Sequence, residues 1–264
     1  MTAATPVTPE SPGTVVAVIS GGMDSATLAY LLADEGWQLR LVSFDYGQRH
    51  AKELDCARRL AAHLHSPHEV IDLRSVGTRL SGSALTDAEV DVPDGHYTDQ
   101  SMRSTVVANR NAIFASVAVG LAVAASARAV ALGVHAGDHT VYPDCRPEFV
   151  AALRHLALVA NEGFVTADFE VLAPFVEWSK ADIASLGYKL DVPFADTWSC
   201  YRGGEQHCGR CGTCVERREA FVAAGVADPT PYTTAAVDMP DPTSTARSGS
   251  SGSSARSARS GKDS

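Results

Sequence analysis

The sequence of 264 residues predicts an α/β protein with a doubly wound, mostly parallel sheet of five strands. Two observations support this prediction: short β-rich apolar runs alternate with helical runs, and these strands end in apolar runs, which is typical of a parallel sheet covered on both faces. No internal repeat is present. The expected strands are 14–20, 39–46, 68–73, 129–134 and 170–175, and the expected helices are 24–35, 49–64, 112–128 and 147–161.

The chain divides into one large domain, one small subdomain and two polar ends. We expect the α/β domain over 14–195 and a cysteine-rich subdomain over 196–228. Residues 1–13 are rich in Thr and Pro, and 238–264 are rich in Ser and Arg with almost no apolar side chain, so both ends are predicted to be disordered. Residues 74–104 lack periodicity, which is typical of a functional lid or of a disordered loop.

Charge and hydrophobicity exclude several classes of protein. The formal net charge is −9, and the body is more acidic than the whole because the tail from Pro240 onward carries more basic than acidic residues. Such a body disfavours broad binding to a nucleic-acid backbone. No apolar run approaches the roughly 18 residues of a membrane span, and the N-terminus lacks the pattern of a secretory signal. We expect a cytoplasmic protein with no membrane contact and no direct nucleic-acid contact.

A glycine turn follows the first expected strand. In Ser20-Gly21-Gly22-Met23-Asp24-Ser25 the glycines allow positive φ and let an anion approach backbone N–H groups, while the serines add hydroxyl donors. The next helix directs its positive dipole end to the same place. The turn is neither a Walker A loop, since no Gly-Lys-Ser/Thr follows, nor the dinucleotide fingerprint, which needs a third glycine. It predicts a phosphate site; the structural alternative is a plain strand-to-helix turn with a Ser or Asp N-cap.

Four of the six cysteines lie within fifteen residues. Cys200, Cys208, Cys211 and Cys214 have the spacing C-x7-C-x2-C-x2-C, with Gly209 and Gly212 between them. In a reducing compartment this spacing favours a structural zinc site with four thiolate ligands over a redox pair or an iron–sulfur centre. A nucleic-acid-binding knuckle is disfavoured because no aromatic–basic alternation surrounds the cysteines. We expect His207 to be a surface neighbour rather than a ligand.

Further polar motifs fall where the strands end. The segment FDYGQRH, residues 44–50, offers Tyr46, Gln48, Arg49 and His50 at the edge where ligands of a parallel sheet bind, or else caps a helix. The segment NRN, residues 109–111, places Arg110 and Asn111 at a helix start. The loop GVHAGDHTVYPDCRPEFV, residues 133–150, is dense in polar groups, which is typical of a binding loop. Its structural alternative is that Asp144 and Arg146 pair and cap the next helix.

Together these motifs resemble a known family. The turn SGGMDS resembles the pyrophosphate loop of the ATP pyrophosphatases, whose fold is of the adenine nucleotide alpha hydrolase type. With FDYGQRH, NRN, YPDCRPEF, WSKADI and the cysteine pattern, the order and spacing from about residue 15 to 225 resemble the 7-cyano-7-deazaguanine synthase family, which makes the nitrile precursor of queuosine.

The resemblance implies an ATP-dependent ligase that forms carbon–nitrogen bonds. ATP would adenylate the carboxylate of 7-carboxy-7-deazaguanine, ammonia would displace AMP, and a second adenylation on the amide oxygen would give 7-cyano-7-deazaguanine. Asp24, Ser25 and Lys180 would be catalytic, with Mg²⁺ accompanying the ATP substrate. Residues Ser20, Gly21, Gly22, Met23, Asp24, Ser25 and Ala26 would surround the ATP phosphates, and Arg110, Asn111, Asp144 and Arg146 would contact substrate. A solvated helix lysine is the alternative for Lys180.

Two rival functions stay open at this stage. One is a related adenylating amidotransferase or tRNA-thiolation enzyme, for which Cys56 and Cys145 are the candidate sulfur carriers. The other is a zinc-stabilised nucleotide-binding module without turnover. The resemblance also implies a homodimer, which the sequence pattern does not test.

Overall fold

A five-stranded parallel sheet forms the centre of the molecule. The computed structural model describes residues 12–96 and 102–234. Its strands are β1 (Thr14–Val18), β2 (Gln38–Asp45), β3 (His68–Asp72), β4 (Ala129–Ala131) and β5 (Glu170–Leu172), in the order β3-β2-β1-β4-β5. All four pairings are parallel. The predicted fold class and all five predicted strands are confirmed, although β1, β4 and β5 end two to three residues earlier than predicted.

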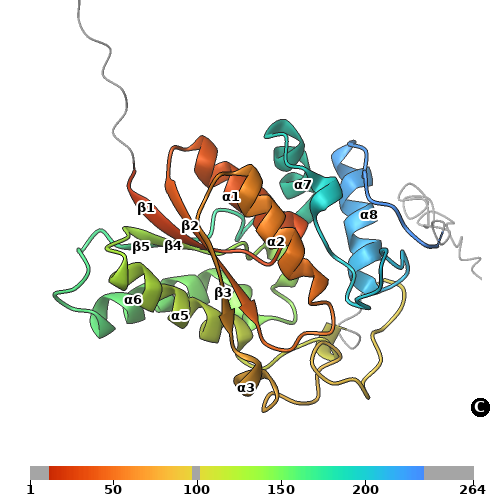
Figure 1. Cartoon of the computed structure of the whole chain (residues 1–264), viewed down its shortest axis with the longest axis horizontal. Helices are drawn as coiled ribbons and strands as arrows, with labels where there is room; N and C mark the ends of the chain where they lie inside the picture. Colours follow the sequence, from red (N-terminus) through yellow and green to blue (C-terminus); the bar gives the residue numbers. More distant parts are fainter. Residues whose placement is uncertain (1–11, 97–101, 235–264) are drawn as a thin grey trace, which may run out of the picture.

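Helices cover both faces of the sheet (Figure 1). The α-helices are α1 (Met23–Asp34), α2 (Lys52–His63), α3 (Arg74–Gly77), α5 (Arg110–Ala124), α6 (Pro147–Ala160), α7 (Lys180–Lys189) and α8 (Gly212–Ala224). Short 3-10 turns are η1 (Ala136–Asp138), η2 (Pro143–Cys145) and η3 (Phe194–Asp196). None of the helices in these described ranges is long and apolar enough to cross a membrane.

Two apolar clusters fix the helices on their faces. One joins β1 to α1, α2, α7 and α8 through side chains such as Leu28, Leu60 and Ile183. The other joins the opposite face to α5 and α6 through side chains such as Phe44 and Leu153. The wrapping direction reverses between β1 and β4, because β2 and β3 lie on one side of β1 while β4 and β5 lie on the other. Such a switch point opens a crevice at the carboxyl ends of the strands.

Helices α7 and α8 were not among the helices that the sequence predicted. Helix α7 begins with a capping box, in which the Ser179 side chain accepts from the Asp182 backbone N–H and the Asp182 side chain accepts from the Ser179 N–H. Helix α8 begins directly after Cys211, so its first turn coincides with the cysteine motif. Helix α5 begins at Arg110, as the NRN motif predicted, directly after Asn109 in a left-handed conformation with φ +56°, and it ends at Ala124 rather than at the predicted residue 128.

The described part of segment 74–104 is packed against the cysteine loop. The Arg49 guanidinium donates to the Asp87 carbonyl at 2.7 Å, and Gly95 N–H donates to the Arg210 carbonyl at 2.8 Å. Ala84 and Val92 are buried in one apolar cluster with the cysteines. This segment therefore helps to hold the cysteine loop, a role that neither the lid nor the disorder prediction included. The predicted disordered ends, 1–13 and 238–264, lie outside the described residues apart from Pro12 and Gly13.

Candidate active site and metal centre

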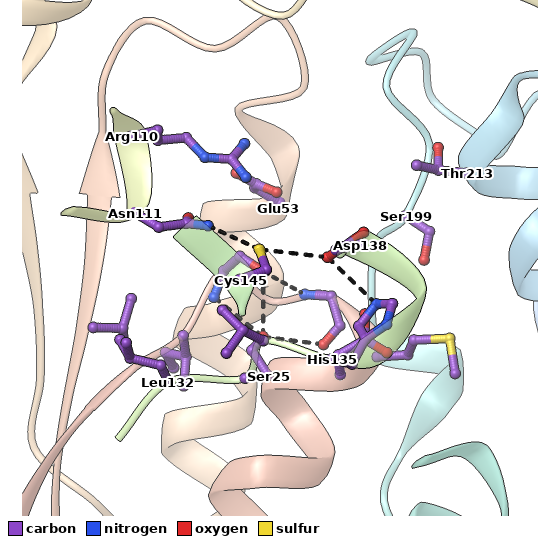
Figure 2. A pocket seen from close by; sticks show the side chains of 18 of the residues that line it. Ser25, Glu53, Arg110, Asn111, Leu132, His135, Asp138, Cys145, Ser199 and Thr213 are labelled. Carbon is purple, nitrogen blue, oxygen red and sulfur yellow. Dashed lines mark hydrogen bonds and ion pairs between the residues drawn. The ribbon is translucent and has the colours of Figure 1, made fainter. Parts of the chain in front are cut away.

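A cleft of about 230 Å³ lies at the carboxyl ends of the strands, at the switch point between the paired strands β1 and β4. Its lining comes from the glycine turn, the end of β2, the start of α5, the loop after β4, helix α7 and the cysteine segment (Figure 2). The predicted site residues that line it are Ser20, Gly22, Met23, Asp24, Ser25, Arg110, Asn111 and Lys180. Segments far apart in the sequence thus converge on one crevice.

The glycine turn places the N-terminus of α1 at the cleft. Gly21 has φ +88°, and its Cα approaches α2 so closely that a Cβ would lie 2.2 Å from the Glu53 carbonyl oxygen. Gly22 is the N-cap residue of α1 and makes no side-chain cap, so the structural alternative of a Ser or Asp N-cap is wrong. The first turn of a helix leaves backbone N–H groups without intrahelical partners. These donors and the helix dipole favour an anion at this position.

The two serine hydroxyls brace the turn. Ser25 Oγ accepts from the Ser20 N–H at 3.1 Å, Ser20 Oγ accepts from the Gly22 N–H at 3.2 Å, and the two hydroxyls lie 3.2 Å apart. Met23 lines the cleft but is otherwise buried, and Ala26 is fully buried behind it. Of the predicted phosphate-loop residues, Gly21 and Ala26 shape the loop from outside the cleft lining.

Asp24 and Lys180 meet at the mouth of this turn. Lys180 Nζ lies 3.6 Å from Asp24 Oδ2 and donates to Glu216 Oε2 at 2.6 Å. Burial would lower the pKa of Lys180, but the carboxylates of Asp24 and Glu216 outweigh it and raise that pKa above its ordinary value. The lysine therefore stays charged in the cleft, and the alternative of a solvated helix lysine is wrong.

The two carboxylate oxygens of Asp24 have different surroundings. Oδ2 faces Lys180 and lies 3.9 Å from His135 Nε2, whereas Oδ1 is buried without a hydrogen-bond partner. An unpaired buried carboxylate oxygen is costly unless a ligand satisfies it. Hard divalent cations such as Mg²⁺ prefer carboxylate oxygen, so Oδ1 fits an Mg²⁺ that arrives with ATP.

Arg110 and Asn111 begin α5 on the far wall of the cleft. Arg110 is half-buried beside Tyr46 and Tyr201; burial would lower the pKa of its guanidinium, yet the two tyrosines raise that pKa overall. Burial raises the pKa of Tyr46 to about 12, so its phenol stays neutral. The aromatic rings of Phe44 and Phe114 stack at 4.2 Å on the same side. This wall offers a cation and flat apolar faces, which suit a planar anionic ligand.

Asp144 and Arg146 lie outside the cleft lining. Asp144 Oδ2 accepts from the Asn111 backbone N–H at 3.1 Å, and Arg146 Nε donates to the His139 carbonyl at 2.7 Å. Arg146 is also the N-cap residue of α6. No ion pair joins these two residues, both of which are described, so the structural alternative in which they pair is wrong, although Asp144 does stabilise the start of α5. Their direct contact with substrate stays a prediction.

The segment FDYGQRH serves both the cleft and the fold. Tyr46 and His50 line the cleft as predicted. Gln48 is buried, accepts from the Tyr46 N–H at 2.9 Å and donates to the Phe44 carbonyl at 3.0 Å, so it shapes the turn. Arg49 donates to segment 74–104 rather than to the cleft.

Several lining residues were missed by the candidate list. They are Glu53, His135, Asp138, Cys145, Ser199, Thr213 and Glu216. The polar density of loop 133–150 did point to His135 and Asp138, because that loop follows a strand at the ligand edge. Nothing in the sequence pattern singled out Glu216, Ser199 or Thr213, which reach the cleft because the cysteine segment and α8 fold over it.

The four predicted cysteines converge. The Sγ atoms of Cys200, Cys208, Cys211 and Cys214 all lie within 4.8 Å of one another, with separations of 3.9 Å for Cys208–Cys214 and 4.0 Å for Cys200–Cys211. A tetrahedral ion with metal–sulfur bonds of about 2.3 Å requires separations of about 3.8 Å. The donor set and its geometry therefore fit one metal ion.

Backbone geometry supports this cluster. Gly209 has φ +74°, as expected for a tight turn between ligands, whereas Gly212 is simply the first residue of α8. The Cys208 sulfur accepts from the N–H groups of Arg210 at 3.5 Å and Cys211 at 3.3 Å. Such N–H donors stabilise thiolate charge and orient the ligand.

His207 is buried, so its prediction as a surface neighbour is wrong. Its ring packs on Trp198 with centroids 4.3 Å apart, and Nε2 accepts from the Ser199 N–H at 3.0 Å. That bond occupies Nε2, and the four-sulfur group does not include His207. His207 thus fixes the backbone beside the cysteines and beside Ser199 of the cleft.

Comparison with known proteins agrees with the site. The family model described as "Queuosine biosynthesis protein QueC" matches residues 14–225. A 7-cyano-7-deazaguanine synthase from Rhizobium rhizogenes is 56% identical over 234 residues, covering 89% of this chain and 96% of the relative. One from Brucella anthropi is 58% identical over 215 residues, covering 81% and 91%.

Likeness to solved structures is weaker. The U34-tRNA thiolase NcsA from Methanococcus maripaludis is 14% identical with a TM-score of 0.47, covering 80% of this chain and 65% of that chain. The assignment rests on the family model and the curated relatives: this chain belongs to the QueC family of queuosine biosynthesis proteins.

Proposed function

We propose that this chain is a 7-cyano-7-deazaguanine synthase, an ATP-dependent ligase that converts 7-carboxy-7-deazaguanine and ammonia to the nitrile and releases AMP and pyrophosphate. Family membership and the similarity to curated synthases support the reaction. The structural observation that carries it is the meeting of the α1 N-terminus, Asp24 and Lys180 in one cleft. These groups match what adenylation by ATP requires.

The proposed roles follow from position. The turn 20–26 holds the ATP phosphates against the free N–H groups of α1. Lys180 is a persistent cation beside that turn and offsets the negative charge that develops on departing pyrophosphate. Asp24 Oδ1 would hold Mg²⁺, which adds further charge neutralisation when bound.

Two adenylations explain why one site performs both rounds. A carboxylate oxygen is a poor leaving group, and transfer of AMP to it creates a good one, which ammonia displaces to give the amide. The amide oxygen is then adenylated in turn, and loss of AMP leaves the nitrile. The acceptor must present an oxygen to the same α-phosphate each time, so the wall formed by Arg110, Asn111 and the aromatic rings would keep the deazapurine in place.

We propose that the metal is structural zinc held by the four cysteines. Four thiolates leave no open coordination position, which is typical of structural rather than catalytic sites. Trp198, Ser199 and Thr213 of this segment line the cleft. Zinc would therefore stabilise the subdomain proposed for residues 196–228 and, through it, one wall of the active site.

Burial of the two other cysteines disfavours a sulfur-carrier function. Burial raises the pKa of Cys145, and burial likewise raises that of Cys56 despite the Arg59 guanidinium that donates to its sulfur at 3.1 Å. Both therefore remain neutral thiols, which are poor nucleophiles. The acidic net charge also disfavours tRNA as a substrate. We propose a cytoplasmic enzyme with small-molecule substrates, which forms a homodimer as its family resemblance implies.

The test is a product assay. The protein is incubated with 7-carboxy-7-deazaguanine, ATP, Mg²⁺ and ammonium, and products are identified by mass. The expected products are the amide, the nitrile, AMP and pyrophosphate. Absence of both amide and nitrile from metal-loaded, folded protein would overturn the proposal.

A further inference from the structure

The reaction of the proposed function requires a base that the roles above do not supply. Ammonia carries three N–H bonds and a nitrile nitrogen carries none, so three protons must leave the nitrogen in each complete turnover. One leaves when ammonia displaces AMP to form the amide, and two leave between the amide and the nitrile. Proton removal in the transition state is worth roughly 10²- to 10⁴-fold in rate when a side chain is positioned for it.

Most proton acceptors in the cleft are already engaged. Glu216 accepts from Lys180 at 2.6 Å, and Asp24 faces the same lysine and the phosphate turn. Glu53 accepts from Gln48 Nε2 at 3.1 Å through Oε1, while its Oε2 lies 3.4 Å from His50 Nε2. Glu216 and Glu53 therefore have close hydrogen-bond partners within the protein, while the proposed function already assigns Asp24 to Lys180 and Mg²⁺.

Neither cleft histidine offers a free lone pair to substrate. His135 is buried, and its Nδ1 accepts from the Gly137 N–H at 3.1 Å, which places the proton of the neutral ring on Nε2. That Nε2 faces Asp138 Oδ2 at 3.6 Å and acts as a donor. His50 Nε2 faces Glu53, and its Nδ1 is buried and shielded from solvent.

Asp138 differs from the other acids of the cleft. Its side chain lines the cleft from the loop after β4 and is 29% exposed, similar to 23% for Asp24 and 26% for Glu216, so its partners rather than its exposure set it apart. Its contacts with His135 Nε2 at 3.6 Å and Cys145 Sγ at 3.9 Å are long and both involve Oδ2, and the Lys180 ammonium acts on the carboxylate from further away. Figure 2 shows its carboxylate between His135 and Cys145, with Asn111 beyond Cys145. A carboxylate with weak partners and an open oxygen retains the capacity to accept a proton.

We propose that Asp138 is the general base that removes protons from the attacking and departing nitrogen. In the first round ammonia forms a C–N bond to the adenylated carbonyl carbon, Asp138 accepts one N–H proton, and the C–O bond to AMP breaks. In the second round the adenylated amide gives up its two N–H protons in succession to Asp138, which returns the first to solvent between transfers. The C–O bond to AMP breaks as C≡N forms.

His135 orients this base. Its Nε2–H lies between Asp138 Oδ2 and Asp24 Oδ2, 3.6 Å from the first and 3.9 Å from the second. Because the Gly137 N–H fixes the ring through Nδ1, the donor direction is set by the backbone. The base is thereby placed next to the phosphate turn, where the adenylated carbon forms.

The experiment separates adenylation from nitrogen transfer in the variant Asp138→Asn. Exchange of labelled pyrophosphate into ATP, dependent on 7-carboxy-7-deazaguanine, reports adenylation alone. Ammonia-dependent amide formation, and nitrile formation from supplied amide, report the steps that need the base. Hydroxylamine is a third probe, because it is a strong nucleophile that loses its proton readily and should trap the acyl adenylate as hydroxamate without a protein base.

The expected result is that Asp138→Asn retains exchange and hydroxamate formation within about threefold of wild type but loses roughly 10²-fold or more of both ammonia-dependent steps. Glu148→Gln is the matched control, since it removes an exposed carboxylate from the first turn of α6, outside the cleft lining, and it should retain every activity. Asp138→Ser serves as a second variant if the melting temperature of Asp138→Asn is well below that of wild type.

Two outcomes overturn the assignment. If Asp138→Asn also loses exchange, Asp138 acts in ATP or Mg²⁺ binding rather than as the base. If ammonia-dependent steps persist near the wild-type rate, no base at Asp138 is needed. A wild-type protein that shows neither exchange nor product would instead contradict the proposed function, so the two failures are distinguishable.

Discussion

Lys180 Nζ and Glu216 Oε2 lie 2.6 Å apart and join helix α7 to helix α8 across the mouth of the phosphate turn. Glu216 follows the last cysteine of the cluster by two residues, on the helix whose N-cap is Cys211. The lysine proposed to act on pyrophosphate is thus held by a helix that the cysteine cluster anchors. The metal centre and the reaction centre share one structural element.

Glu216→Gln should separate lysine positioning from ATP binding. The glutamine oxygen still accepts a hydrogen bond but without charge, a difference of about 1 kcal/mol, so kcat for adenylation should fall about fivefold. The KM for ATP should stay unchanged or fall, because a negative charge beside the phosphates has been removed. Pyrophosphate-exchange kinetics measure both constants.

The matched control lies on the same helix. Glu219→Gln removes a carboxylate that pairs with His96 at 2.7 Å, away from Lys180, and should leave both constants unchanged. Lys180→Met should lower exchange by about 10²-fold or more. Equal kcat values for Glu216→Gln and Glu219→Gln would count against a positioning role of Glu216.

Metal removal should destabilise the C-terminal part of the chain and also loosen the residues of this segment that line the cleft. Structural zinc contributes on the order of 10 kcal/mol in small metal sites, so chelation should lower the melting temperature and loosen residues 200–214. Ser199 and Thr213 should lose protection in hydrogen exchange, because they adjoin the cluster. Metal content is measured alongside, and an unchanged melting curve for verified metal-free protein would contradict a structural metal.

Gly21 and Gly22 should respond differently to the same substitution. Gly21→Ala forces an L side chain to φ +88° and brings its Cβ to 2.2 Å from the Glu53 carbonyl oxygen. Backbone strain alone costs about 1–2 kcal/mol, so the melting temperature should fall by at least about 2 °C. Gly22→Ala places its Cβ 3.3 Å from Ser20 Oγ and 3.5 Å from the Trp198 carbonyl oxygen, and φ is −78° at this position. This variant should have a melting temperature near that of wild type. Equal melting temperatures would rule out the steric argument.

The local sequence pattern predicted the sheet, but it did not predict which distant segments converge on the cleft. The strands around Val16 and Val42 are recognisable because buried parallel strands are apolar on both faces. The phosphate turn and the four cysteines are recognisable because their spacing alone carries the chemistry. The role of Glu216 cannot be recognised from the sequence, because it depends on helix α8 packing against Lys180. The local pattern around Glu216 holds no information about that distant partner.

Burial produced the remaining errors. His207 adjoins a polar, glycine-rich motif, which suggests a surface position, yet Trp198 and Tyr232 enclose its ring. Asp144 and Arg146 lie in a loop at the ligand edge, but Asp144 accepts from the Asn111 backbone N–H at the start of α5 and Arg146 donates to the His139 carbonyl, so the alternative in which they pair with each other is wrong. Whether a polar side chain in such a loop points to ligand or to backbone is decided by tertiary packing, which the sequence pattern does not reveal.

The stability of the sheet edge should depend on pH through His68. Burial, followed by the nearby Arg58 charge, lowers the pKa of His68 below its ordinary value of 6.5. Ser43 Oγ donates to the Ile19 carbonyl at 2.6 Å and lies 2.8 Å from His68 Nε2, so it accepts the proton of the neutral ring. The folded state therefore binds fewer protons than the unfolded state below about pH 6.5. The free energy of unfolding should fall as pH drops from about 6.5 to the folded pKa, and His68 should have no effect above that window.

Urea unfolding at about pH 7.5 and about pH 5.5 measures the loss of unfolding free energy, which should be smaller in His68→Asn than in wild type. His63→Gln, at the exposed end of α2, is the control and should keep the wild-type loss. If His68→Asn and His63→Gln lose the same free energy over this interval, His68 does not carry the linkage.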